Sequence, residues 1–286
     1  MAAPDANRLL DDSRPLIMGI LNVTPDSFSD GGMFESPDDA AECALRMVEG
    51  GADIIDIGGE STRPPGSAYG EGAEEVSFEE EWKRVIPVIE RIRRVDPNIP
   101  ISVDTQKSDV AELALEEGAN IINDVSAGTS DPEMFRVAAN RRVPIILMHG
   151  HGPRFRKLRI EDYEYDDVVS EVLDYLTERI AAARAAGVYD LMADVGFGFA
   201  KGYRDNYRLL RHHDRFSSLG VPMVLGISRK SSIGKAMGDN IAPKDRVTGS
   251  IAAACYAVQH GAAIIRTHDV KETREALAVI SAILTT

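Results

Sequence analysis

The sequence has few cysteines, no long apolar run and no excess of positive charge, and each absence excludes a class of protein. Among 286 residues there are two cysteines, Cys43 and Cys255, too few for a disulfide framework or a cysteine-rich metal site. No apolar stretch reaches the ~18 residues that a membrane-spanning helix needs. Residues 1–14 lack the apolar core and the basic start of a secretory signal, and we expect them to form a flexible N-terminus. The formal net charge of −14 disfavours nucleic acid and anionic lipid. We therefore expect a cytoplasmic protein with no nucleic-acid or membrane partner.

The chain does contain enough apolar material for one large core. Hydrophobic residues make up 44% of the sequence and charged residues 27%, a composition typical of globular proteins. A length of 286 residues suits one α/β barrel, which typically needs ~250 residues. No linker or low-complexity stretch divides the chain. We therefore predict a single domain over residues 1–286.

Short apolar runs alternate with amphipathic segments along the whole chain. The runs are rich in Ile, Val and Leu without polar alternation, which suits strands of a parallel sheet that is buried on both faces. Eight such βα units favour a closed (β/α)₈ TIM barrel over an open doubly wound sheet. The predicted strands are residues 16–21, 52–57, 99–103, 120–122, 143–148, 190–193, 222–227 and 262–265, and the predicted helices are residues 37–50, 77–95, 108–118, 132–141, 161–186, 204–216, 245–260 and 271–284.

Polar and ionisable side chains follow the apolar runs, at the end where each predicted strand finishes. In a TIM barrel, that end of the strands forms the face on which active sites are built. Any single one of these residues could be an ordinary loop residue or a helix N-cap, but that explanation accounts poorly for all eight strands. The acceptors and amides are Asn22, Asp104, Asn123 and Asp194, and the basic side chains are Arg63, Lys230, Arg266 and His268.

These two classes of side chain suit two kinds of ligand. Carboxylates beside amides suit a flat heterocycle with N–H donors and ring-nitrogen acceptors, because they can form paired hydrogen bonds with its edge. A buried polar group that is left unpaired costs ~1–3 kcal/mol. Arginine binds phosphate or carboxylate through paired hydrogen bonds. His268 could instead be a structural histidine at a strand end.

Two long polar loops, residues 24–36 and 61–76, could be substrate clamps over the barrel mouth or plain surface loops.

Six segments of the sequence form a recognisable set, and together they are far more specific than any one of them. They are GILNVTPDSFSDGG at residues 19–32, DIGGESTRP at 56–64, ISVDT at 101–105, INDVSAG at 122–128, LGISRKS at 225–231 and RTHDV at 266–270. On these segments the sequence resembles the dihydropteroate synthase family over nearly its whole length. The resemblance implies a transferase of folate biosynthesis. It would join 6-hydroxymethyl-7,8-dihydropterin pyrophosphate to p-aminobenzoate by an SN1-like displacement, releasing pyrophosphate and 7,8-dihydropteroate.

The resemblance also implies where each substrate binds. The pterin ring is expected deep in the barrel, the pyrophosphate beside it with Mg²⁺, and p-aminobenzoate nearer the mouth. The pterin residues would be Asp104, Asn123, Met148, Asp194, Lys230 and Arg266, of which Asp104, Asp194, Lys230 and Arg266 are also expected to be catalytic. The pyrophosphate residues would be Asn22, Arg266 and His268, with Asn22 also the Mg²⁺ ligand. The p-aminobenzoate residues would be Phe28, Thr62, Arg63, Pro64, Phe199 and Ser231.

The chain departs from the family's usual pattern at several places near this predicted site. Val195 stands where the family usually has proline, Ala200 where it has glycine, and Ser232 where a bulky residue is more common. Pro65 is an additional proline in the second loop. The residues expected to bind the pterin are unaffected, whereas affinity for p-aminobenzoate and its sulfonamide mimics could differ.

Two alternatives share pterin recognition with this interpretation. One is a pterin-dependent methyltransferase, which would have no use for the pyrophosphate and aminobenzoate groups. The other is a catalytically impaired paralogue that still binds pterin. The apolar faces of residues 245–260 and 277–284 are compatible with a homodimer, which we expect.

Overall fold

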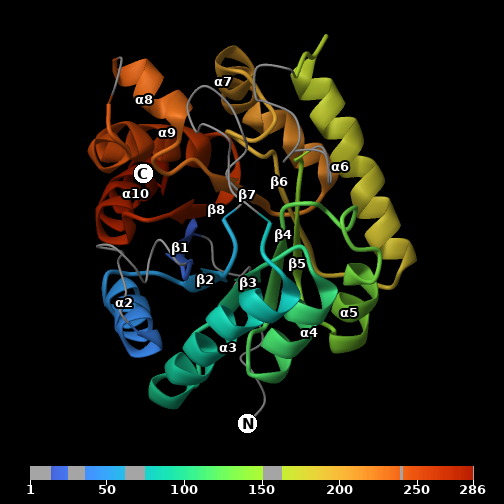
Figure 1. Cartoon of the computed structure of the whole chain (residues 1–286). Helices are drawn as coiled ribbons and strands as arrows, with labels where there is room; N and C mark the ends of the chain where they lie inside the picture. Colours follow the sequence, from blue (N-terminus) through green and yellow to red (C-terminus); the bar gives the residue numbers. More distant parts are fainter. Residues whose placement is uncertain (1–13, 25–35, 62–74, 151–162, 239–240, 286) are drawn as a thin grey trace.

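The computed structural model describes residues 14–24, 36–61, 75–150, 163–238 and 241–285. Its strands pair in parallel and in chain order into one closed barrel, with helices packed around the outside (Figure 1). The predicted TIM barrel is therefore confirmed. The strands are β1 Leu16–Asn22, β2 Ile54–Gly58, β3 Ile101–Asp104, β4 Ile121–Asp124, β5 Ile145–Met148, β6 Leu191–Asp194, β7 Met223–Gly226 and β8 Ala262–Thr267.

The helices follow the strands, and most begin near their predicted positions. Ser36 and Ser77 cap the first two helices by accepting hydrogen bonds from Asp39 N and Glu80 N, which satisfies amides that have no partner within the helix. The helices are α2 Pro37–Glu49, α3 Phe78–Val95, α4 Ser108–Glu116, α5 Met134–Arg141, α6 Val168–Ala185, α7 Tyr203–Arg211, α8 Ser231–Met237, α9 Val247–Gln259 and α10 Val270–Thr285, with 3₁₀ helices η4 His213–Leu219 and η5 Pro243–Arg246.

One predicted helix begins at the wrong residue, and one short helix is absent from the predictions. Helix α6 begins at Val168 rather than at residue 161, because the Asp167 side chain accepts from Val169 N and caps the helix there. Helix α8 was not predicted. It is only 7 residues long, and its sequence SSIGKAM has too few apolar positions to show a helical period.

The barrel has two apolar layers because successive residues of a strand point to opposite faces. Outward-pointing residues pack against the helices and form the larger core, at whose edge the free cysteines Cys43 and Cys255 pack. Inward-pointing residues form a second cluster inside the barrel, made of Leu16, Met18, Ile54, Ile121, Ile146, Met192, Val224 and Ile264. Two residues further along six of these strands lie Asp56, Asn123, Met148, Asp194, Gly226 and Arg266. The same alternation that builds the apolar interior therefore places a largely polar layer above it, toward the carboxyl ends of the strands.

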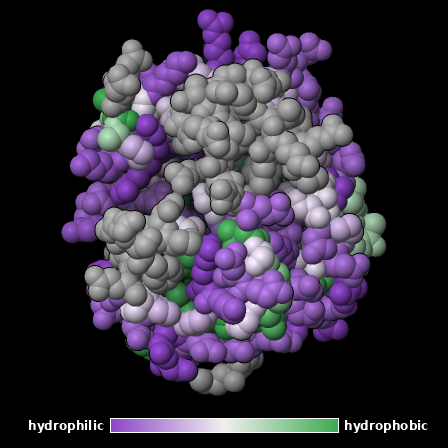
Figure 2. Space-filling view, in the orientation of Figure 1, coloured by the Kyte–Doolittle hydropathy of each residue, from purple (hydrophilic) through white to green (hydrophobic). Residues whose placement is uncertain are grey.

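The surface is mainly hydrophilic on the face that Figure 2 shows, with scattered apolar residues. Larger apolar side chains are exposed on α9 and α10, where Tyr256 is 37% exposed, Val279 61% and Ile283 66%. Among the described residues, no helix combines the length and apolar character that crossing a bilayer requires.

Candidate active site

The register of the strands brings the predicted pterin residues to one level of the barrel. Asp104 at the end of β3 lies opposite Gly58 on β2 and Asn123 on β4. Met148 on β5 lies opposite Asp194 on β6, and Gly226 on β7 lies opposite Arg266 on β8. Gly58 leaves room beside Asp104, since a Cβ added at Gly58 would lie 3.4 Å from the Asp104 Cβ. These side chains therefore form a ring around the barrel axis.

Arg266 joins two carboxylates across this ring. Its Nε donates to Asp56 Oδ2 at 2.6 Å and its Nη2 donates to Asp104 Oδ2 at 2.7 Å. Burial disfavours the guanidinium charge, but Asp56 and Asp104 more than offset this and raise the pKa of Arg266. Asn123 Nδ2 also donates to Asp56 Oδ2 at 3.2 Å. Asp56 is thus held by two donors, and the arginine is oriented by two acids.

Three acceptor atoms in this ring have no hydrogen-bond partner within the described part of the chain. They are Asp56 Oδ1, Asp104 Oδ1 and Ser102 Oγ, all buried. Burial raises the pKa of Asp104 to about 7, against the opposing effect of Arg266 and with further repulsion from Asp56 and Glu81. Unsatisfied buried acceptors are rare and costly in folded proteins. The floor of the site therefore suits a ligand that brings N–H donors.

The opposite side of the ring combines a carboxylate, a lysine and an apolar wall. Asp194 Oδ1 accepts from Gly196 N at 2.7 Å; burial raises the pKa of Asp194, while Gly196 and Lys230 oppose that rise. Lys230 Nζ lies 3.9 Å from the centroid of the Phe199 ring. Burial, and then Arg266, lower the pKa of Lys230 to about 7. Met148 packs with Phe199 and Val125. A flat ring could be bounded by Met148 and the lysine–phenylalanine pair.

A buried lysine that sequence reasoning missed shapes this wall. Lys201 is 1% exposed and donates to three backbone carbonyls, those of His149 at 3.0 Å, Gly196 at 3.1 Å and Phe199 at 2.9 Å. Its burial lowers the pKa of Lys201 to about 7. The ammonium group ties the loop after β6 to the end of β5. Its position in the sequence, among glycines and phenylalanines, gave no sign of this role.

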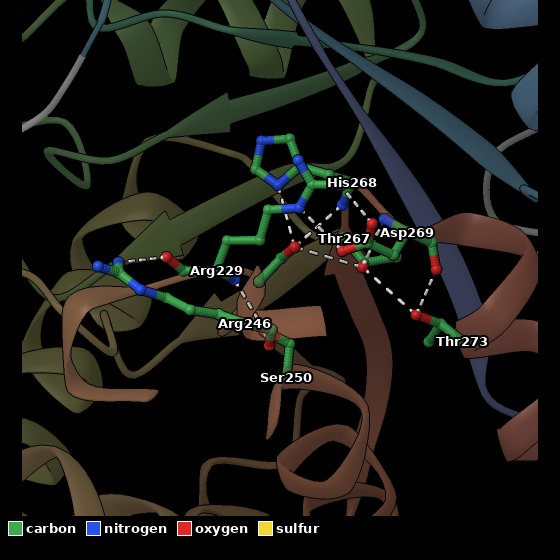
Figure 3. Close-up of polar contacts among 8 residues, drawn as sticks. Arg229, Arg246, Ser250, Thr267, His268, Asp269 and Thr273 are labelled. Atoms are coloured by element: carbon green, nitrogen blue, oxygen red, sulfur yellow. Dashed lines mark hydrogen bonds and ion pairs between the residues drawn. The ribbon is translucent and has the colours of Figure 1, made fainter. Parts of the chain in front are cut away.

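The predicted anion residues lie beside the ring, where β8 ends. His268 follows β8 directly and is half-buried, and its pKa is lowered to about 3 by burial and by Arg266 and Arg229. Its Nδ1 lies 3.0 Å from Ser228 Oγ. Figure 3 shows His268, Thr267, Asp269 and Thr273 in one network of hydrogen bonds. Asn22, at the exposed end of β1, has its Oδ1 3.7 Å from the point where a Cβ on Gly58 would lie.

The predicted p-aminobenzoate residues are only partly described. Phe199 borders the ring and Ser231 begins α8, close in sequence to Lys230. Phe28, Thr62, Arg63 and Pro64 lie outside the described residues, as does Pro65.

The three described departures from the family pattern are buried. Ala200 has a left-handed φ of 49°, a region in which glycine is less strained, and its carbonyl accepts from Tyr165 OH at 2.7 Å. Ser232 Oγ accepts from Asn206 Nδ2 at 3.1 Å, so this hydroxyl links α8 to α7. Val195 is fully buried in the outer core. Each of these positions has a packing role in the loop or helix that carries Phe199 or Ser231.

Sequence comparison identifies the family. The family described as pterin binding enzyme matches residues 18–268. Dihydropteroate synthase from Escherichia coli strain K12 is 48% identical over 278 residues, which cover 96% of this chain and 94% of that protein. The chain belongs to the dihydropteroate synthase family. Its reaction is thus a transferase step of folate biosynthesis, and the pterin-dependent methyltransferase alternative is set aside.

Solved structures of the dihydropteroate synthase family agree with this fold. A structure from Xanthomonas albilineans with 4-aminobenzoic acid has a TM-score of 0.86 and 47% identity, covering 96% of this chain and 94% of that one. Another from the same organism, in complex with 7,8-dihydropteroate, has a TM-score of 0.82 and 45% identity, covering 96% of this chain and 95% of that one. The barrel fold is therefore shared along nearly the whole chain.

Proposed function

We propose that the chain joins 6-hydroxymethyl-7,8-dihydropterin pyrophosphate to p-aminobenzoate, with the pterin ring in the polar layer of the barrel. The observation that carries the proposal is a set of buried polar atoms that have no partner among the described residues, Asp56 Oδ1, Asp104 Oδ1 and Ser102 Oγ. A pterin has an amino group and ring N–H groups along one edge, which supply the missing donors. The Asn123 side chain on β4 and the Asp194 side chain on β6 are proposed to complete the rim that binds this edge. Asp56 and Ser102 join the residues expected from the sequence.

The reaction requires a leaving pyrophosphate and a transient positive charge on the pterin methylene carbon. Asp104 and Asp194 are buried carboxylates that favour this charge in a site with little water. Arg266, held by Asp56 and Asp104, faces both the pterin and the departing anion. The Lys230 side chain, on the same side of the ring as Asp194, is proposed to bound the pterin there. No covalent intermediate with a side chain is required, because the aniline nitrogen of p-aminobenzoate attacks the cation directly.

The anion and the second substrate use the outer part of the site. Asn22, Arg266 and His268 are proposed to bind pyrophosphate. Phe199 and Ser231 are proposed to contact p-aminobenzoate, together with the residues outside the described part of the chain, which are Phe28, Thr62, Arg63 and Pro64. The polar loops that follow β1 and β2 in the sequence are proposed to help hold the two substrates at the mouth of the barrel.

Mg²⁺ is proposed to enter with the pyrophosphate. Within the described ranges, no group of three or more His, Cys, Asp or Glu is placed to hold a metal ion. Asn22 offers a single amide oxygen, which fits Mg²⁺ because this ion commonly keeps several waters and binds one or two protein oxygens plus substrate phosphates. When bound, Mg²⁺ would neutralise charge on the leaving pyrophosphate.

We also propose that residues 1–286 form one domain and that the protein acts in the cytoplasm as a homodimer. The apolar side chains exposed on α9 and α10, Tyr256, Val279 and Ile283, support a self-association surface. Sedimentation of the purified chain decides between monomer and dimer.

Product formation tests the proposed reaction. The purified chain is mixed with Mg²⁺, the pterin pyrophosphate and p-aminobenzoate, and 7,8-dihydropteroate and pyrophosphate are measured together. Equal amounts of both products are expected, with none when either substrate is left out. Tight pterin binding without product would instead show a catalytically impaired paralogue and refute the proposal. Asp104→Asn serves as the low-activity reference.

A further inference from the structure

Ser228 bonds twice to His268. Its Oγ lies 3.0 Å from the ring Nδ1 and accepts from the backbone N of the same residue at 3.1 Å. Ser228 follows β7 and is 6% exposed, so bulk water competes little with these bonds. One serine hydroxyl thereby holds both the main chain and the ring of the histidine that follows β8.

The hydrogen bonds around Ser228 determine where its single hydroxyl hydrogen goes. The hydroxyl already accepts from His268 N, and it has two remaining neighbours: His268 Nδ1 at 3.0 Å and Thr267 Oγ1 at 3.5 Å. The second distance is at the outer limit for an O–H···O bond, whose usual length is ~2.7–2.8 Å. Donation to Nδ1 is therefore the better use of the hydrogen.

The neighbouring threonines agree with this direction. Thr273 donates its hydroxyl hydrogen to Asp269 O, and Thr267 Oγ1 accepts from Asp269 N at 3.1 Å. Thr267 can then donate to Thr273 Oγ1 at 3.3 Å, or to Ser228 Oγ. In either case Thr267 needs no hydrogen from Ser228. The hydroxyl hydrogen of Ser228 is therefore left for the imidazole ring.

Further hydrogen bonds hold the two loops that carry Ser228 and His268. Asp269 accepts from Arg229 Nε at 3.0 Å and from Arg229 Nη2 at 2.5 Å. Ser250 Oγ in turn accepts from Arg229 N at 2.9 Å, and Arg246 Nη1 donates to Arg229 O at 2.9 Å (Figure 3). The paired bonds from Arg229 to Asp269 thus join the loop after β7 to the loop after β8, whereas the bonds from Ser250 and Arg246 hold only the Arg229 main chain.

We infer that Ser228 is a positioning residue that holds neutral His268 in the tautomer protonated at Nε2. An imidazole that accepts at Nδ1 carries its hydrogen on Nε2 when neutral. No described residue bonds Nε2, so this hydrogen is available to an anion at the barrel mouth. A lowered pKa, caused by burial and by Arg266, is consistent with the neutral ring.

The tautomer matters for the pyrophosphate that we assign to this place, and this consequence rests on the proposed function. A neutral N–H donor adds a directed hydrogen bond without repelling the nearby Arg266 and Lys230. The opposite tautomer would present a bare lone pair at Nε2 to a phosphate oxygen, and the two would repel. Ser228 therefore decides whether His268 assists or opposes the anion.

Nitrogen NMR of the histidine rings tests the tautomer without any substrate. Two-bond ¹H–¹⁵N correlation spectra distinguish Nδ1–H from Nε2–H rings, and loss of one signal set in His268→Gln assigns His268 among the 6 histidines. We expect an Nε2–H pattern in the unmodified protein, a shift toward Nδ1–H in Ser228→Ala, and its return in Ser228→Thr. Ser250→Ala is the matched control, since Ser250 is also buried but holds Arg229 instead. An Nδ1–H pattern in the unmodified protein, or no change in Ser228→Ala, overturns the inference.

Affinity for inorganic pyrophosphate with Mg²⁺ separates this inference from the proposed function. Loss of one oriented hydrogen bond is expected to weaken pyrophosphate about three- to tenfold in both Ser228→Ala and His268→Gln. A loss in His268→Gln but not in Ser228→Ala overturns the positioning role. No loss in either variant refutes the anion site of the proposed function, while the NMR result still decides the tautomer.

Discussion

Arg266 donates to Asp104 Oδ2 at 2.7 Å and leaves Asp104 Oδ1 buried with no partner in the described part of the chain. One oxygen is thus neutralised by the protein and the other is left for substrate. Asp104→Asn keeps the size of this side chain but removes its charge. We expect turnover to fall at least about a hundredfold, as when other electrostatic stabilisers of a transition state are removed. Affinity for the unreactive pterin alcohol should fall less than turnover, because the single amide oxygen can still accept from the pterin when the NH2 group is turned away from it. Turnover within a few-fold of the unmodified enzyme would contradict a cation-stabilising role.

The same residue gives an expected pH dependence. Burial raises the pKa of Asp104 to about 7, so the free protein loses this negative charge as the pH falls through that value. If the carboxylate is the active form, kcat/KM for the pterin pyrophosphate should fall about tenfold per pH unit below the pKa. Asp104→Asn should remove this acid limb. If kcat/KM of the variant still falls at the same pH, the ionisation belongs to another group.

Much of this ring could be predicted from the sequence, since motif residues such as Asn123 and Asp194 end runs of buried strand. Asp56 and Ser102 were not singled out, although each also has a strand position that points inward. The signal that could have found them is the alternation itself: Asp56 follows Ile54 by two residues, and Ile54 belongs to the inner apolar layer. Lys201 could not be found in this way. Its three acceptors are backbone carbonyls, which leave no pattern of residue types.

Arg266 and His268 should respond differently to truncation. The sequence assigns both residues to the pyrophosphate, but in the structure Arg266 also forms ion pairs with two buried acids, Asp56 and Asp104. Arg266→Ala leaves those charges unpaired, and breaking a buried ion pair in this way costs about 3–5 kcal/mol. We expect it to weaken both the pterin alcohol and the pterin pyrophosphate and to lower stability in urea.

His268→Ala is the comparison. It breaks no ion pair in the described structure, so stability should change little and only the pyrophosphate-bearing pterin should bind more weakly. Calorimetry with both pterins measures the two affinities. Equal losses for both ligands in His268→Ala would indicate a structural strand-end histidine instead.

Lys201→Met should change the KM values of the two substrates to different extents. The change removes the donor to the carbonyls of His149, Gly196 and Phe199, each of which would be left without that bond in the interior. With ~1–3 kcal/mol for an unsatisfied buried group and partial relaxation, we expect a loss of stability of about 3 kcal/mol. Because Phe199 lies on the affected loop, KM for p-aminobenzoate should rise more than KM for the pterin pyrophosphate.

Lys235→Met on α8 controls for the loss of a lysine. Lys235 is exposed, and surface substitutions of this kind usually change stability by about 0.5 kcal/mol or less. Parallel rises in both KM values for Lys201→Met would show general damage to the barrel rather than displacement of the Phe199 wall.

A largely buried ion cluster of Lys107, Glu60 and Glu81 lies at the end of β2. Lys107 Nζ lies 2.5 Å from Glu60 Oε2 and 2.5 Å from Glu81 Oε2, and the Glu81 side chain is 0% exposed. Glu60 also accepts from Val76 N at 3.2 Å, so it joins the end of β2 to the residues that precede α3. Lys107→Met leaves two acids facing each other, and we expect unfolding in urea to require about 3–5 kcal/mol less.

A second substitution tests whether Lys107→Met loses stability through unpaired charge or through loss of packing. Burial raises the pKa of Glu81, and Lys107 is the largest influence that opposes this rise. Without the lysine, the negative charge of the Glu81 carboxylate would be buried without its neutralising partner. Glu81→Gln in the Lys107→Met background removes that charge and should restore part of the lost stability. Lys83→Met, an exposed lysine on α3, should leave stability nearly unchanged. If the double variant is no more stable than Lys107→Met alone, the methylene chain of Lys107 rather than its ammonium group stabilises this corner of the barrel.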